Sequence, residues 1–110
     1  MTVRFARQVS GLRRISLPKR LTQAVAIPEL GFVRVELAPT GLKALKVLPA
    51  EQLDGAARRD PTRPRQLNTA RQVTLPAPLM DAVELAVLEW VHVSRSPDGD
   101  GLLVEPAGIL

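Results

Sequence analysis

An internal repeat constrains this chain more than any other sequence feature. Shifted by 58 positions, Arg13-Arg14-Ile15-Ser16-Leu17-Pro18 falls on Arg71-Gln72-Val73-Thr74-Leu75-Pro76 without a gap. More identities follow at the same shift, namely Arg7/Arg65, Gln8/Gln66, Leu21/Leu79, Ala24/Ala82, Val25/Val83, Leu30/Leu88, Val33/Val91, Val35/Val93, Pro39/Pro97, Gly41/Gly99 and Leu45/Leu103. A fixed internal period marks copies of one supersecondary unit. With 110 residues, the chain is therefore one domain or two small interlocked units.

Each copy has the pattern strand, strand, short helix, strand, strand. In the first copy, alternation predicts strands at 3–9, 15–17, 32–37 and 42–48, and helical spacing after Pro18 predicts a helix from Leu21 to about Ile27. Proline is well placed at the first turn of a helix, where its missing N–H costs nothing. The second copy repeats this with a helix near 79–85 and strands at 90–94 and 102–105. Proline and glycine turns at 39–41 and 97–99 join the last two strands of each copy.

The predicted organisation is a first repeat at 1–48, a linker at 49–63 and a second repeat at 64–110. The segment from Pro49 to Pro64 combines prolines, arginines, small residues and acidic residues, which is typical of an exposed linker. The predicted fold class is mainly β with short helices. Within it, Trp90, which aligns with Phe32, is predicted to anchor the core, and His92 to lie on the surface.

The composition excludes most catalytic and metal chemistry. The sequence has no cysteine and a single histidine, His92, so disulfides, thiolate-bound metals and histidine clusters are absent. Asp98 and Asp100 flank Gly99 like part of a calcium loop, but the further ligands of such a loop are missing. No serine or threonine has a base partner of a plausible kind. We therefore expect a protein that is not an enzyme and that uses no cofactor and no metal.

No stretch of the sequence has the form of a secretion signal or a membrane span. The N-terminal residues alternate charged and apolar side chains, and no apolar run is long enough to cross a bilayer. The expectation is a cytoplasmic, nucleoid-associated protein without membrane contact.

The repeated unit resembles the AbrB/SpoVT-like swapped-hairpin family, which includes the MazE-type antitoxins. The family pattern is close to Gly-Arg, two apolar or threonine positions and Ile-Pro, followed by a helix led by leucine. Here it reads Arg13-Arg14-Ile15-Ser16-Leu17-Pro18-Lys19-Arg20-Leu21 and Arg71-Gln72-Val73-Thr74-Leu75-Pro76-Ala77-Pro78-Leu79. The resemblance implies a swapped-hairpin β-barrel. Two tandem copies, as in MraZ-like proteins, can close such a barrel within one chain, and a linker of this length has the necessary reach.

The resemblance also implies double-stranded DNA as the partner. The family places the arginine that ends the first strand and the arginine before the second strand on the DNA face, and these correspond to Arg7 and Arg14. Lysine and arginine bind DNA chiefly by neutralising phosphates. The full predicted DNA-binding set is Arg4, Arg7, Arg13, Arg14, Lys19, Arg20, Arg65 and Arg71. The alternative interpretation of these cations is a solvated strand edge that discourages aggregation.

Charge divides the two repeats. Residues 1–48 carry nine Lys/Arg and two Asp/Glu, a net +7, whereas residues 64–110 carry three and six, a net −3; the segment 49–63 carries three of each. The sum is the overall charge of +4. We therefore predict DNA contact chiefly in the first repeat, and a scaffold or a protein-binding surface in the second.

Three functions follow from these observations. The leading hypothesis is a sequence-specific DNA-binding transcriptional regulator that forms a dimer or higher homo-oligomer. An alternative is an antitoxin-like interaction protein that binds a partner protein and autoregulates; its partner would bind the second repeat or the linker, because few residues follow the repeat. A structural scaffold with incidental basicity is a third possibility, and it predicts weak, salt-indifferent DNA binding.

Overall fold

The strands and helices follow the repeat in order. A computed structural model describes residues 3–39, 43–51 and 62–108. The first repeat forms β1 (Arg4–Gln8), β2 (Arg14–Ser16), α1 (Lys19–Ala24), β3 (Phe32–Leu37) and β4 (Leu45–Ala50). The second forms β5 (Arg65–Gln66), β6 (Gln72–Thr74), α2 (Ala77–Ala82), β7 (Trp90–Arg95) and β8 (Leu102–Gly108). The predicted class, mainly β with short helices, is confirmed.

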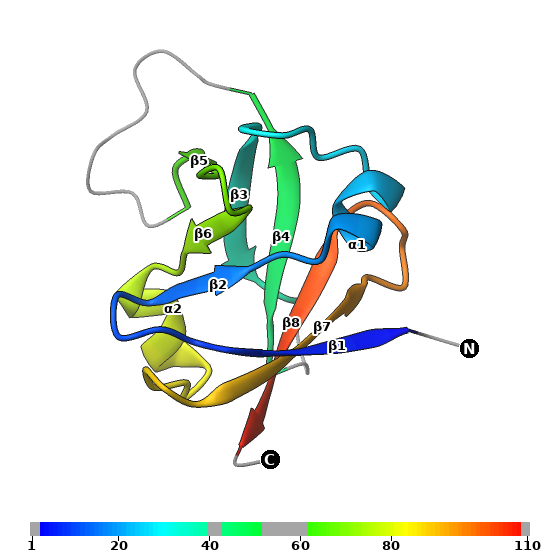
Figure 1. Cartoon of the computed structure of the whole chain (residues 1–110). Coiled ribbons are helices and arrows are strands. Elements are labelled where there is room, and N and C mark those ends of the chain that lie inside the picture. The colour runs from blue at the N-terminus through cyan, green and yellow to red at the C-terminus, as the bar shows by residue number, and fades with distance from the viewer. Residues whose placement is uncertain (1–2, 40–42, 52–61, 109–110) are drawn as a thin grey trace.

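The strands pair across the repeats. The larger sheet has the order β1-β7-β8-β4-β3-β5, so the first strand of each repeat lies beside the third strand of the other. The two hairpins, β3–β4 and β7–β8, join through β4 and β8 at the centre (Figure 1). β1 and β5 are the two edges of this sheet in the described residues. The closed barrel implied by the family resemblance is therefore not formed by these hydrogen bonds.

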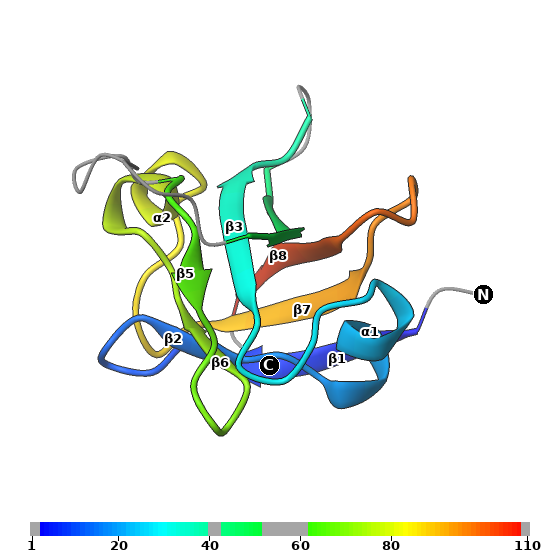
Figure 2. The same cartoon turned by 90° about the horizontal axis from the view of Figure 1, so that it is seen from above.

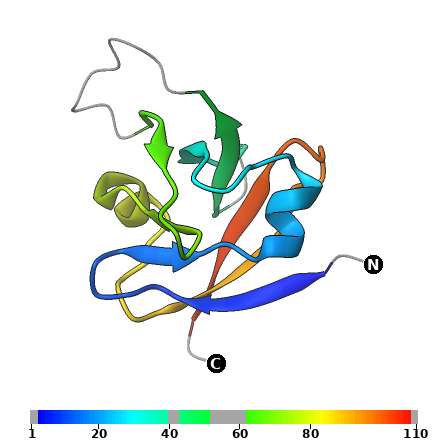
Figure 3. The same cartoon turned by 45° about the horizontal axis from the view of Figure 1, so that its top comes forward.

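A second, two-stranded sheet covers the core-facing side of the larger sheet. β2 and β6 pair antiparallel, with Ile15 opposite Val73, and both side chains are fully buried. The two helices lie at opposite ends of this β2·β6 ribbon (Figures 2 and 3). Buried valines and leucines of the large sheet complete the core, so apolar side chains from both repeats form one cluster. Neither repeat contains this core alone.

The last strand of each repeat shows that the gapless alignment is wrong there. Leu37 pairs with Leu45 in the first hairpin, whereas Arg95 pairs with Leu102 in the second. The structural counterpart of Leu45 is thus Leu102 and not Leu103. The second hairpin loop is one residue shorter, and the register of β7 and β8 shifts between Trp90 and Val91.

Both helices end earlier than the apolar spacing predicts. α1 stops at Ala24, and the N–H of Ile27 donates to the carbonyl of Thr22 at 2.8 Å across Ala26, which has a φ of +60°. α2 stops at Ala82 in the same way, and the N–H of Leu85 donates to the carbonyl of Met80 at 2.9 Å across Glu84, which has a φ of +55°. This is the Schellman arrangement, in which a residue with left-handed backbone allows its own N–H and the next N–H to donate to carbonyls in the last turn of the helix. Ile27 is buried after the helix rather than within it.

Two further sequence predictions need correction. Trp90 is only half-buried, because Val91 and Val93 of the same strand take the core face and strand alternation turns Trp90 to the other side. β4 continues through Pro49 and Ala50, so the predicted linker begins inside a strand. Residues 52–61 of that linker lie outside the described residues. His92 is half-buried, on the same face of β7 as Trp90.

Candidate functional site

Two matching turns set the positions of Arg13 and Arg71. The Ser10 hydroxyl oxygen accepts the N–H groups of Leu12 at 3.2 Å and Arg14 at 3.1 Å, and the Asn68 amide oxygen accepts the equivalent pair in the second repeat. Such side-chain bonds to the backbone are typical of serine and asparagine turns. Each turn places its arginine in the left-handed region, with φ of +61° at Arg13 and +55° at Arg71.

The backbone of both arginines belongs to the β2·β6 ribbon. The carbonyl of Arg13 accepts the N–H of Leu75 at 2.7 Å, and the carbonyl of Arg71 accepts the N–H of Leu17 at 2.9 Å. The two arginines therefore mark opposite ends of the ribbon and are related by the repeat. Left-handed backbone costs a residue with a Cβ about 1 kcal/mol, and glycine avoids this cost. Arg13 stands where the family pattern has glycine.

At the Arg13 end, three arginines from two segments of the chain line one depression. Arg13, Arg63 and Arg65 line one depression of about 250 Å³, together with Thr74 and the residues 75–78 that lead into α2. Burial, followed by the charges of Arg63 and Arg13, lowers the pKa of Arg65 from its ordinary value. No acidic residue is among the described residues that line this depression. We call Arg13, Arg63 and Arg65 the arginine cluster.

Two details make the arginine cluster receptive to an anion. The Nε of Arg65 is buried and has no hydrogen-bond acceptor within the described chain. A buried donor left unsatisfied costs about 1–3 kcal/mol, which an incoming oxygen would recover. Arg14 is exposed and is paired in the ribbon with Thr74, which lines the depression.

At the Arg71 end, the equivalent side chains are engaged within the protein. Nη1 of Arg71 lies 3.7 Å from Oε1 of Glu29, a residue of the first repeat. Arg7, the counterpart of Arg65, folds back on its own strand: its Nη1 donates to the carbonyl of Ala6 at 2.9 Å, and its guanidinium lies 5.6 Å from the Phe5 ring centre. The two ends of the ribbon thus share a backbone and differ in the contacts that Arg71, Arg7 and Arg65 make.

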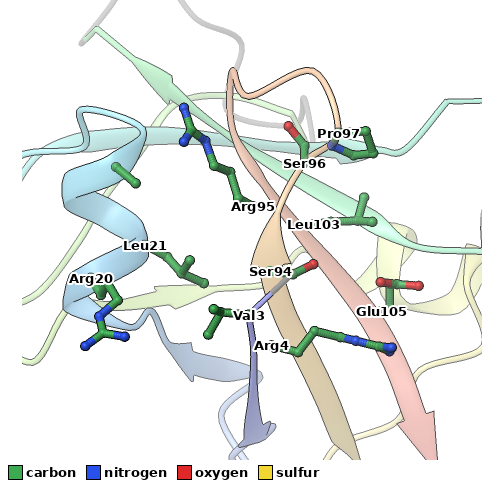
Figure 4. Close-up of a pocket in the computed structure, with 11 residues that line it drawn as sticks. Val3, Arg4, Arg20, Leu21, Ser94, Arg95, Ser96, Pro97, Leu103 and Glu105 are labelled. Carbon is green, nitrogen blue, oxygen red and sulfur yellow. The ribbon is translucent and has the colours of Figure 1, made fainter. Parts of the chain in front are cut away.

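The remaining predicted cations lie elsewhere. Arg4 and Arg20 line a second, open depression with Arg95, near the start of β1 and α1 (Figure 4). Its lining residues come from both faces of the sheet, because Arg4 is opposite Ser94 whereas Arg95 is opposite the core residue Leu102. It is therefore a surface that wraps around a sheet edge rather than an enclosed site. Lys19 is exposed at the first position of α1.

The structure thus brings Arg13, Arg14 and Arg65 together, and it separates Arg4, Arg7, Lys19, Arg20 and Arg71 from them. Sequence reasoning placed Arg63 in the linker and missed it. Its sequence signal is its position two residues before Arg65, but Thr62 and Arg63 form a turn and a bend before β5, which the sequence did not predict. Glu29 was also missed, and a comparison with Val87 at the equivalent repeat position would have exposed the difference.

Asp98 and Asp100 neutralise a buried lysine. The Nζ of Lys46 lies 3.0 Å from Asp100 and 3.6 Å from Asp98, and the lysine side chain is 9% exposed. The hydrogen bond to Asp100 raises the pKa of Lys46, and the same bond, with a second from Ser96, lowers the pKa of Asp100. These residues stabilise the centre of the sheet and are not part of the arginine cluster.

No helix in the described residues is both long and apolar enough to span a membrane. No protein-family model, curated protein or solved structure matches the chain.

Proposed function

We propose that this protein is a DNA-binding regulator of the AbrB-like swapped-hairpin type, in which the two tandem repeats take the places of two subunits. The pairing of β1 with β7 and of β5 with β3 supports this, because each repeat lends its first strand to the hairpin of the other. The β2·β6 ribbon holds Arg14 within β2, and it is extended at its two ends by the backbone hydrogen bonds of Arg13 and Arg71.

The arginine cluster is the observation that carries the proposal. Burial, followed by the charges of Arg63 and Arg13, lowers the pKa of Arg65, and the buried Nε of Arg65 has no hydrogen-bond acceptor among the described residues. A buried donor without an acceptor is unfavourable, like charges around one depression are unfavourable too, and the left-handed backbone at Arg13 adds to the cost. Costs of this kind are typical of functional sites, and a phosphate ester is the anion that offsets them here.

The residues divide into two roles. Arg13, Arg63 and Arg65 neutralise backbone phosphates and set the position of the duplex. Arg14, exposed on the outer face of the ribbon, is placed to reach a base edge, where arginine binds guanine with two hydrogen bonds. The DNA surface is therefore composite: it includes Arg65 of the second repeat and does not belong to the first repeat alone.

Glycine substitution at the two left-handed arginines tests this function without disturbing the fold. Arg13→Gly and Arg71→Gly each remove a guanidinium and relieve the backbone, so both variants remain folded. Binding to a fluorescent duplex of mixed sequence is measured by anisotropy between 50 and 200 mM salt, and then to fragments selected from genomic DNA. For about four phosphate contacts, log K of the wild type falls against log salt with a slope of about −3 to −4.

Arg13→Gly is expected to weaken binding about tenfold and to reduce the slope by about one, because one charge-assisted contact is lost. Arg71→Gly is the matched control and changes binding much less. Salt-indifferent binding by the wild type would sink the proposal and favour a scaffold or a protein partner. Equal losses in the two variants would refute the restriction of DNA contact to the Arg13 end while leaving DNA binding intact.

A further inference from the structure

The two ends of the β2·β6 ribbon differ at one acidic position. Glu29 lies 3.7 Å from Arg71, whereas the equivalent position at the other end, which belongs to the second repeat and faces the Arg13 end, holds Val87. The side chain of Glu29 is 82% exposed and that of Arg71 is 31% exposed. The surrounding backbone is the same at both ends, since Leu30 and Leu88 share a left-handed conformation and each follows the position in question.

Each of these loops is tied to the edge strand of the other repeat. Gln8 donates from its side chain to the carbonyl of Leu88 at 2.9 Å, and Gln66 donates in the same way to the carbonyl of Leu30 at 2.9 Å. These bonds hold residues 29 and 87 beside the turns that carry Arg71 and Arg13. The side chain at each position therefore decides whether the neighbouring arginine has an internal counter-ion.

The Arg71 end does not lack cations. Lys19 and Arg20 occupy the repeat positions of Ala77 and Pro78, and Ala77 and Pro78 line the depression of the arginine cluster. Without Glu29, the Arg71 end would present Arg71 and Lys19 where the other end presents Arg13 and its neighbours. An acidic side chain beside a phosphate is repelled, so Glu29 acts against this second contact.

We propose that Glu29 is a negative determinant that limits DNA phosphate contact to the Arg13 end and so makes the pseudo-symmetric ribbon bind DNA from one side. This inference rests on the proposed function. Glu29 forms an ion pair with Arg71 that competes with a DNA phosphate, whereas Val87 has no charge with which to pair Arg13. One chain then contacts one half of a site, and a palindromic operator requires a second chain.

The repeat supplies its own reciprocal variants. Glu29→Val gives the Arg71 end the residue of the other end, and Val87→Glu gives Arg13 the counter-ion that Arg71 has. Glu29→Gln is a conservative second variant that keeps the size of the side chain. Glu36→Gln is the charge-matched control for the Glu29 variants, and Leu37→Glu is the control for Val87→Glu. Glu36 and Leu37 are the last two residues of β3, at the opposite end of that strand from Phe32 and Val33, which pair with β5.

Glu29→Val and Glu29→Gln are expected to raise affinity for the mixed-sequence duplex two- to fivefold, the scale of a surface ion pair, and to steepen the salt slope by about one. Val87→Glu is expected to lower affinity by a similar or larger factor and to flatten the slope by about one. Ethylation interference on a selected fragment should show added phosphate contacts in Glu29→Val and fewer in Val87→Glu.

The outcomes separate this inference from the proposed function. If the wild type does not bind DNA, or binds without salt dependence, the proposed function fails. If the wild type binds and Arg13→Gly weakens binding, but each Glu29 variant changes affinity no more than Glu36→Gln, net charge accounts for the effect and the role of Glu29 is refuted. Equal effects of Val87→Glu and Leu37→Glu overturn the inference as well.

Discussion

The Arg13 end and the Arg71 end of the ribbon have the same backbone and opposite electrostatic behaviour. Both have a turn held by a polar side chain and an arginine in the left-handed region. At one end the arginine joins two others, and at the other it pairs with Glu29. The buried residues of the two repeats maintain the shared backbone, whereas exposed residues are free to diverge. Pseudo-symmetry of the fold is therefore no guide to symmetry of the function.

The largest expected effect tests whether the two repeats contribute equally to one core. Leu17 and Leu75 occupy equivalent positions and are 2% and 0% exposed. Leu17→Ala and Leu75→Ala should each reduce the free energy of unfolding by about 2–5 kcal/mol, because each leaves a cavity in the shared core. Urea denaturation followed by circular dichroism should show a single transition in both variants. Two separate transitions would show that the repeats fold independently.

The next effect concerns an ion-pair contact between the two hairpins, from Lys46 on β4 to the turn between β7 and β8. Asp98→Asn with Asp100→Asn removes both counter-ions of Lys46, and the melting temperature should fall by several degrees because a buried ammonium loses its partners. Leucine occupies the equivalent position, Leu103, in β8. Lys46→Leu in the double variant should restore most of the loss. No recovery would show that the aspartates act through the turn and not through the lysine.

The same pair predicts a pH dependence. The folded-state pKa of Asp100 lies below the ordinary value of 3.8, so its contribution is fully present above that value and is lost as the pH falls through the lower, folded value. Unfolding midpoints measured between pH 6 and pH 2.5 should decline on the acidic side. In the variant with both aspartates changed to asparagine, this part of the decline should be absent. An unchanged acid profile would contradict the ion pair.

The smallest effect compares the two helix ends. Ala26 has left-handed backbone at the end of α1, so Ala26→Gly should stabilise the protein by about 0.5–1 kcal/mol in thermal unfolding. Glu84→Gly, just after α2, should increase the stability of the protein less than Ala26→Gly. The substitution also removes the ion pair between Glu84 and Lys43, which lowers the pKa of the glutamate. A loss of stability in Ala26→Gly would argue against the left-handed conformation.

Most of the fold could be predicted from the sequence because the buried positions of both repeats are apolar at strand or helix spacing. The apolar alternation and the two Leu-Pro steps predicted every described strand and both helices in order. The register of the last strand was also readable: Leu45, Val47, Pro49 and Ala50 match Leu102, Val104, Pro106 and Ala107 at a shift of 57. A gapless alignment hid this, because it did not allow the shorter hairpin loop.

The candidate site was less accessible because it depends on contacts between distant segments. Net charge by segment predicted DNA contact chiefly in the first repeat. The predicted DNA-binding set did include Arg65, but nothing in the sequence indicated that Arg65 and Arg13 line one depression. Charge counts give no information on whether Arg7 lies over Phe5 or whether Arg71 pairs with Glu29. Helix ends were misjudged for a related reason, since apolar spacing continues through a left-handed residue.

The pairing of each repeat's first strand with the other repeat also determines when that strand can pair during synthesis. β1 pairs with β7, so residues 4–8 pair with residues 90–94 only after residue 94 has been synthesised. Contacts of such long sequence separation slow folding, and an unpaired strand is exposed to association with other chains meanwhile. The arginines of β1 and the turn that follows it therefore leave the ribosome before their partners exist, and their charge helps the nascent chain to remain separate from its neighbours.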